Sequence, residues 1–167
     1  MKIYHQQYTI PMNHNGTQEN WVFDTQEELL TEQNINEQAM HLSDSYAKWA
    51  FASAHYKKLI QLKESELEVF LANAKLVAIE YGKKLGWKYD SEKARIDAVR
   101  NHKDSTGKYV YATDLLILEN TLRELKYYQS IIDGAILESL KIKKEMIITI
   151  GAQIRAGLGA TNLVINK

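Results

Sequence analysis

Mostly apolar side chains recur at alternating steps of four and three along two long stretches of the chain. Such steps place a narrow stripe along one side of a helix. The first stripe runs through Leu42, Tyr46, Trp49, Ser53, Tyr56, Ile60, Lys63, Leu67, Phe70, Ala74, Val77 and Tyr81, and the second through Leu115, Leu118, Leu122, Leu125, Gln129, Ile132 and Ile136. The spacing predicts two long helices with more apolar stripe than one small monomer buries easily, so we expect an oligomer.

The first long helix is predicted from about residue 36 to residue 81, with Gly82 and Gly86 ending it. At about 1.5 Å per residue it would extend for roughly 65 to 70 Å, which suits a bundle, coiled coil or ring better than a compact globule. The second is predicted to begin at a Thr113 or Asp114 cap and to reach residue 155. Gly134 lies inside it at a cost of about 1 kcal/mol relative to Ala, and predicts a kink or a close helix crossing.

Shorter elements surround these helices. Residues 1–23 favour extended structure and predict a hairpin or a loose arm. A short helix is expected from Asp24 or Thr25 to Gln33, and an amphipathic one from Ser91 to His102. The predicted divisions are an N-terminal arm at 1–23, a helical domain at 24–156 and a flexible tail at 157–167. The fold class is therefore all-α with a small extended or hairpin-like arm.

Composition narrows the class of protein. The 167 residues suit one domain, and 45% apolar with 25% charged residues argue against a disordered chain. The absence of cysteine excludes disulfides and thiolate metal sites. The N-terminus lacks the apolar core of a signal peptide, and no run approaches the ~20 apolar residues that span a bilayer. We expect a soluble, cytoplasmic protein without a membrane partner.

No pattern of catalytic residues is present. The five histidines have no metal-ligand spacing, and the C-terminal glycines lack the Lys-Ser/Thr of a phosphate loop. The acidic residues on the predicted helices read as solvated faces. We therefore expect no enzyme activity, no metal and no cofactor.

Charge and aromatic side chains gather in the connector between the long helices, residues 81–111. The whole chain has zero net charge, yet residues 1–45 carry −6 and residues 83–103 carry +4. Single-strand binding needs cations for phosphates and flat rings on which bases stack. The candidates for phosphate contact are Lys83, Lys84, Lys88, Lys93, Arg95 and Arg100, and those for stacking are Trp87 and Tyr89. The alternative is that the aromatic residues are core residues at a helix junction and the lysines are solvated.

Several short motifs resemble the UvsY family of phage recombination mediators. They are Tyr46-Ala47-Lys48-Trp49, Lys57-Lys58 eight residues on, Val69-x-Leu71, Ala74-Lys75-Leu76, Leu125-x-Tyr127-Tyr128-x-x-Ile131-Ile132-Asp133 and the acidic Gln26-Glu27-Glu28-Leu29. The resemblance is spread over roughly residues 25–155. It adds Lys75 and the basic pair Lys57 and Lys58 to the candidate site. Where the family has Lys-Ala-Arg-Leu, this chain has Asn73-Ala74-Lys75-Leu76, so one phosphate contact would be lost; Lys83, Lys84 and Lys88 lie just beyond it.

The resemblance implies a mainly helical protein that assembles into a ring of six or seven subunits. It also implies binding of single-stranded DNA and help in loading a RecA-like recombinase onto strands covered by a single-strand-binding protein, without a catalytic site. The function expected is therefore that of a recombination mediator in phage recombination and repair. The alternatives are a helical scaffold oligomer that does not bind nucleic acid, and a helical adaptor whose acidic arm contacts another protein.

Overall fold

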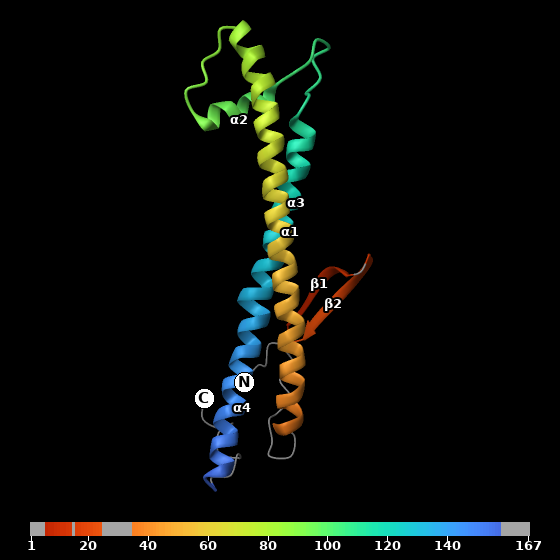
Figure 1. Cartoon of the computed structure of the whole chain (residues 1–167), viewed down its shortest axis with the longest axis vertical. Coiled ribbons are helices and arrows are strands. Elements are labelled where there is room, and N and C mark those ends of the chain that lie inside the picture. Colours follow the sequence, from red (N-terminus) through yellow and green to blue (C-terminus); the bar gives the residue numbers. More distant parts are fainter. Residues whose placement is uncertain (1–5, 15, 25–34, 158–167) are drawn as a thin grey trace. The chain divides into compact units, whose positions relative to one another are not determined.

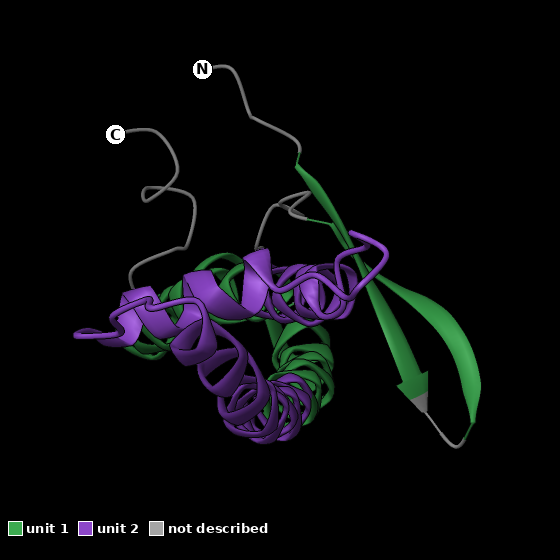
Figure 2. Cartoon of the chain, turned by 90° about the horizontal axis from the view of Figure 1, so that it is seen from above, with its two compact units in different colours: residues 1–55, 128–167 green, residues 56–127 purple. Residues whose placement is uncertain are grey.

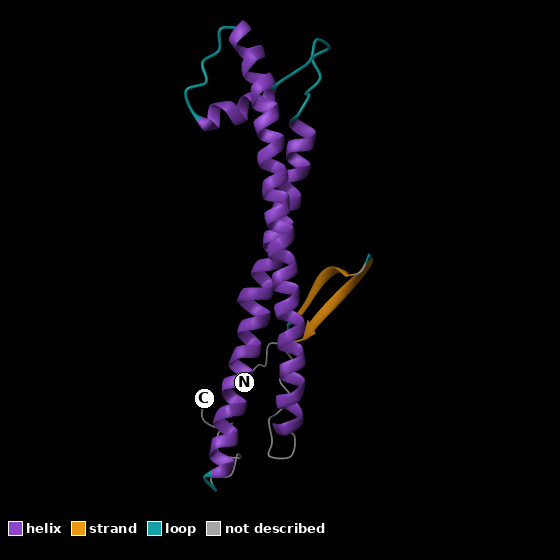
Figure 3. Cartoon of the chain, viewed as in Figure 1, coloured by secondary structure: helices purple, strands orange, loops and turns teal. Residues whose placement is uncertain are grey.

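A computed structural model describes residues 6–14, 16–24 and 35–157 (Figure 3). These residues form a mainly helical fold with a two-stranded hairpin at the N-terminal side, as the sequence predicts. The helix expected from Asp24 or Thr25 to Gln33 and nearly all of the predicted tail lie outside the described residues. The boundaries predicted at residues 24 and 157 stay predictions.

The first long helix, α1, extends over Ile35–Lys84, which confirms the first stripe (Figure 1). Gly82 was expected to end this helix but lies within its last turn. Gly86 follows the helix with a φ of 75°, a conformation that glycine adopts without steric cost. A short helix, α2, follows at Glu92–Asn101 with Ser91 as its N-cap, close to the predicted bounds.

The second long helical stretch contains an irregular turn. It begins at Ala112 and consists of α3 (Ala112–Ile131), a π-helical turn η1 (Ile132–Leu137) and α4 (Glu138–Arg155). The irregular turn contains Gly134, where the sequence predicted a kink or a close crossing. A Cβ atom at Gly134 would meet no described atom within 4 Å, so this glycine is not needed for a close helix crossing.

The described residues divide into two compact units (Figure 2). Unit 1 comprises residues 1–55 and 128–167, and unit 2 comprises residues 56–127. Helix α1 therefore contributes its first part to unit 1 and its second part to unit 2. Unit 1 has seven Lys and Arg against ten Asp and Glu, and unit 2 has fourteen against eleven. The net charges are −3 and +3, so the cationic half of the chain is unit 2.

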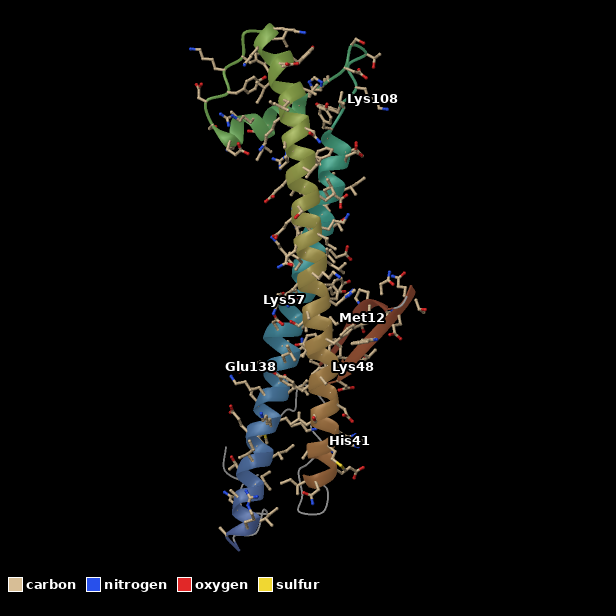
Figure 4. All side chains as sticks on the ribbon, viewed as in Figure 1. Met12, His41, Lys48, Lys57, Lys108 and Glu138 are labelled. Atoms are coloured by element: carbon tan, nitrogen blue, oxygen red, sulfur yellow. The ribbon has the colours of Figure 1, made fainter. Side chains whose placement is uncertain are left out.

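In unit 1 the hairpin strands β1 (Gln7–His14) and β2 (Thr17–Asp24) pair antiparallel in register from Gln7 opposite Asp24 to His14 opposite Thr17. Ile10 and Met12 lie two residues apart on one face of β1 and are almost fully buried. Met12 is labelled on the hairpin in Figure 4. On β2, the rings of Trp21 and Phe23 meet Trp49 of α1 edge-on at 6.0 and 5.7 Å. These aromatic contacts hold the hairpin against α1.

A polar contact in unit 1 accompanies the π-helical turn. The Ser53 hydroxyl of α1 donates to Asp133 Oδ1 at 2.8 Å, and the Gln129 amide donates to Asp133 Oδ2 at 2.6 Å. Ser53 and Gln129 are the two uncharged polar members of the predicted stripes, and Ser53 is buried. Polar residues at such positions fix the register of packed helices at some cost in stability.

The core of unit 2 is formed where α2 and α3 pack beside the second part of α1. Its buried members are Ala74, Ala78, Ala98, Val99 and Leu115, with Leu67, Phe70, Leu71, Tyr89 and Tyr111 packed against them. The two alanines of α1 lie four residues apart on one helical face, so their small side chains leave room for α2. This packing places the segment between α1 and α2 against the core.

Candidate nucleic-acid interface

The end of α1 fixes the position of Trp87. The Trp87 N–H donates to the Gly82 carbonyl at 3.0 Å, and the Gly86 N–H donates to the Lys83 carbonyl at 3.1 Å. With Gly86 in the left-handed region, these two bonds form a Schellman motif. The Trp87 backbone is thereby anchored directly to the helix, while its side chain stays 47% exposed. A half-exposed ring on an anchored backbone suits a stacking platform.

Tyr89 has a different role from the one that the sequence suggested. It is partly buried against the core of unit 2, and its ring lies over Gly82, where a Cβ atom would come 1.5 Å from the phenol oxygen. That oxygen is buried and has no hydrogen-bond partner among the described residues, and burial raises the pKa of the Tyr89 phenol. The ring also meets Trp87 edge-on, with 6.5 Å between centroids. Tyr89 therefore connects the Trp87 ring to the core of unit 2.

Two open hollows adjoin this aromatic pair. The first, which we call the α1 hollow, has a volume of about 440 Å³ and is lined by Ala72, Lys75, Leu76, Ile79, Lys83, Trp87, Tyr89 and Arg95. The second, the α2 hollow, has a volume of about 350 Å³ and is lined by Trp87, Lys88, Tyr89, Ala94, Asp97, Ala98 and Asn101. Six of the candidate binding residues therefore come together at these hollows, three of them as cations of the α1 hollow.

Local structure places α2 beside the hollows. The Ser91 hydroxyl accepts a hydrogen bond from the Ala94 N–H at 3.1 Å and so caps the first turn of α2. Ala98 and Val99 are buried in the core, which turns the opposite face of the helix outward. Arg95 then lines the α1 hollow, whereas Ala94 and Asp97 line the α2 hollow.

Two cations of the α1 hollow are already paired with one carboxylate. Glu92 accepts a hydrogen bond from Lys75 and lies 3.8 Å from the Arg95 guanidinium. The hydrogen bond from Lys75 is the main cause that lowers the pKa of Glu92. A phosphate that reaches Lys75 or Arg95 must therefore compete with Glu92.

The other cationic candidates near α2 differ in whether they form ion pairs. Arg100 pairs with Glu119 at 2.6 Å and with Asp97 at 3.8 Å, so its guanidinium is engaged within unit 2. Within the described ranges, no ion pair involves the lysines between the end of α1 and the start of α2, namely Lys83, Lys84, Lys88 and Lys93.

The basic pair Lys57 and Lys58 is separate from the hollows. Both lysines are exposed on α1, where Figure 4 labels Lys57, and Lys58 precedes Lys75 by about 26 Å of helix. The structure therefore brings six candidates of residues 75–95 together at the hollows, whereas Lys84, Lys93 and this pair line neither hollow.

The remaining aromatic side chains of the connector mostly contact one another. The Tyr81 ring meets His102 edge-on at 5.0 Å, and His102 stacks on Tyr111 at 5.5 Å. Tyr109 lies under the Lys103 ammonium at 4.5 Å. Only Trp87 combines high exposure with a place at both hollows, so the core-junction alternative holds for Tyr89 and Tyr111.

Sequence reasoning missed the apolar wall of the α1 hollow. Ala72, Leu76 and Ile79 recur at steps of four and three, parallel to the predicted stripe, and Leu76 is 68% exposed. That second stripe is the signal that would have identified them. The pairing of Glu92 with Lys75 has no such signal, because it depends on how α2 packs.

Other kinds of site find no support in the described ranges. They contain no group of three or more His, Cys, Asp or Glu side chains placed to hold a metal ion. None of the helices in the described part of the chain is long and apolar enough to cross a membrane.

The comparisons with known proteins add no relative. No protein-family model, no curated protein and no solved structure matches the chain.

Proposed function

We propose that the protein is a recombination mediator that binds single-stranded DNA without base specificity, through the surface formed by the end of α1, the following loop and α2. One observation carries this proposal. The half-exposed Trp87 adjoins two hollows beside lysines that have no ion-pair partner in the described part of the chain.

The chemistry of this surface favours an unpaired strand. An exposed indole stacks with any base, at about 1 to 3 kcal/mol per base, because every base presents a π-face. Lys83, Lys84 and Lys88 supply charges for phosphates whatever the sequence of bases. The wall formed by Ala72, Leu76 and Ile79 is apolar and has no side chain that would select one base. Binding without sequence preference follows from this combination.

The mediator role goes further than the surface and relies on the resemblance to the UvsY family. In this proposal the protein forms a ring of six or seven subunits in the cytoplasm of the host cell. It then helps a RecA-like recombinase to replace the single-strand-binding protein on DNA. Unit 1, with its net charge of −3, is the part left free for protein partners.

A helical scaffold oligomer that does not bind nucleic acid is the second candidate. Leu62, Val69 and Leu76 follow one another at seven-residue steps on α1 and are 58%, 62% and 68% exposed. Such a row on unit 2 suits packing against another chain. The scaffold proposal shares the oligomer and differs only in predicting no affinity for DNA.

Light scattering combined with fluorescence anisotropy separates the two candidates. The mediator proposal expects a particle of six or seven subunits that binds labelled oligo(dT) at low salt and releases it at high salt. The scaffold proposal expects a stable oligomer that ignores the oligonucleotide at both salt concentrations. A monomer without affinity for oligo(dT) would contradict both.

A further inference from the structure

We infer that Trp87 is a partition that separates two successive bases of a bound strand, one in the α1 hollow and one in the α2 hollow. This inference rests on the proposed function and assigns a role within it. It makes Trp87 a residue that favours single strands, because unpaired bases are the ones that can be splayed apart and stacked on side chains.

The two hollows share one wall. Trp87 and Tyr89 line both of them, whereas the other lining residues differ. The α1 hollow has its remaining wall on α1, with Arg95 from α2, and the α2 hollow has its remaining wall on α2, with Lys88. The aromatic pair therefore stands between them.

The size of each hollow suits one base. Sites for small molecules begin at about 300 Å³, and the two hollows have volumes of about 440 and 350 Å³. Apart from Trp87 and Tyr89, which line both hollows, neither hollow has an aromatic lining residue. Two bases on opposite faces of one ring are thus the arrangement that the walls accommodate.

The charged side chains favour different positions for the bases and the phosphates. Lys75, Lys83 and Arg95 are cations at the α1 hollow, and Lys88 is the cation at the α2 hollow. The Asp97 carboxylate also lines the α2 hollow, where it repels phosphate and leaves a neutral base as the favoured occupant. The phosphates are then expected beside the lysines, outside the hollows.

The partition is held before any strand binds. The Trp87 N–H bond to the Gly82 carbonyl fixes its backbone, and the Tyr89 ring supports its side chain at an interplanar angle of 68°. A ring that is already placed loses little conformational freedom on binding, so more of the stacking energy appears as affinity.

Short strands that carry a defined number of bases test this inference. The probes are oligonucleotides of equal length built of abasic nucleotides, with no thymine, one thymine, two adjacent thymines or three. We expect each of the first two thymines to tighten binding by roughly 5- to 100-fold, and the third to add less than about twofold. Trp87→Leu should bind all four strands with the affinity that the wild type has for the fully abasic one. Trp87→Phe should retain a large part of the preference.

Tyr127→Ala is the matched control, because Tyr127 is 61% exposed in the same unit and lines neither hollow. It should keep the full preference. The inference is overturned if the wild type binds all four strands equally, if the third thymine adds as much as the second, or if Trp87→Leu keeps the preference. In each of these cases binding to the phosphates persists and the proposed function stands. Absence of binding to every strand at low salt overturns the proposed function as well.

Discussion

Both units contain an aromatic side chain near a lysine, yet only one of these pairs is suited to bind a strand. In unit 1 the ammonium of Lys48, labelled in Figure 4, lies 4.6 Å from the centre of the Trp21 ring. Trp21 contacts Trp49 and Phe51 at 6.0 and 6.3 Å. In unit 2 the described ring contact of Trp87 is a T-shaped one with Tyr89 at 6.5 Å, and Lys83 has no described ion partner.

The difference lies in what each pair is already bound to. The cation and the rings of unit 1 satisfy one another and hold the hairpin on α1, within a unit of net charge −3. The ring of Trp87 stays half-exposed, and Lys83, Lys84 and Lys88 form no described ion pair. Both belong to a unit of net charge +3. Aromatic and basic residues therefore indicate a binding surface only where the fold leaves them unoccupied.

We expect the largest effect from Gly82→Ala. It should disrupt the surface around Trp87 that distinguishes unit 2 from unit 1. The new Cβ atom would lie 1.5 Å from the Tyr89 phenol oxygen, so the ring must leave its place. We expect a loss of about 1 to 3 kcal/mol in the free energy of unfolding, more than the ~1 kcal/mol that alanine gains in a helix, together with a loss of affinity for oligo(dT). Urea denaturation and anisotropy measure the two.

Gly134→Ala is the control for this substitution, because its Cβ atom would meet no described atom within 4 Å. It should raise the unfolding free energy by up to about 1 kcal/mol and leave the affinity for oligo(dT) close to that of the wild type. Equal effects at the two glycines would show that the support of Tyr89 over Gly82 is unimportant.

The double variant Lys83→Ala/Lys84→Ala should weaken binding of oligo(dT) roughly tenfold or more at low salt. Removing two phosphate contacts should also lower the slope of log K against log salt by about 1.5. The control is Lys63→Ala/Lys126→Ala, which removes the same charge from unit 2 but takes lysines paired with Glu66 and Glu64. An equal loss in the control would mean that net charge, and not the surface around Trp87, determines affinity.

A smaller effect of opposite sign is expected from Glu92→Gln. Without this carboxylate, Lys75 and Arg95 become available to phosphates, so binding should tighten and the salt slope should steepen by about 1. Glu66→Gln removes the same charge beside Lys63 and should change neither quantity. Weaker binding in Glu92→Gln would mean that Glu92 supports the site instead of competing for its cations.

The smallest effect concerns alkaline pH and Tyr89→Phe. Burial raises the pKa of this phenol in the folded protein, while the unfolded chain loses the proton near the ordinary value of 10.0. The wild type should therefore be fully stable below about pH 10 and lose stability above it, and Tyr89→Phe should reduce that loss. At neutral pH the variant should gain up to about 1 kcal/mol, because the buried oxygen has no described partner. Unfolding curves at neutral and alkaline pH check both.

The sequence predicted the helices well because their stripes are local. A helix from residue 36 to 81 was expected and α1 extends over Ile35–Lys84. The difference at its end has a tertiary cause, since Gly82 is needed for the approach of Tyr89 and not for stopping the helix. The weak point at Gly134 was foreseen, but its π-helical form was not; Asp133, in this turn, accepts a hydrogen bond from Ser53, 80 positions earlier.

The sequence predicts which residues lie near one another at the candidate site, but not which ion pairs they form. Trp87 and Lys83 line one hollow, which agrees with their closeness in the sequence, while their role in binding stays a prediction. The assignment of Lys75 and Arg100 to open phosphate sites overlooked ion pairs with Glu92 and Glu119, which depend on how α2 packs against the long helices. Charge counts along the chain cannot reveal such pairing.

The most direct test is to locate the strand on the protein. A short oligonucleotide with 5-iododeoxyuridine among thymines is bound at low salt and cross-linked by ultraviolet light, and the linked residue is identified by mass spectrometry. We expect a link at Trp87, lost in Trp87→Leu and retained in Tyr127→Ala. A link at Trp21 or Phe51 would place the strand on unit 1 and contradict binding at Trp87.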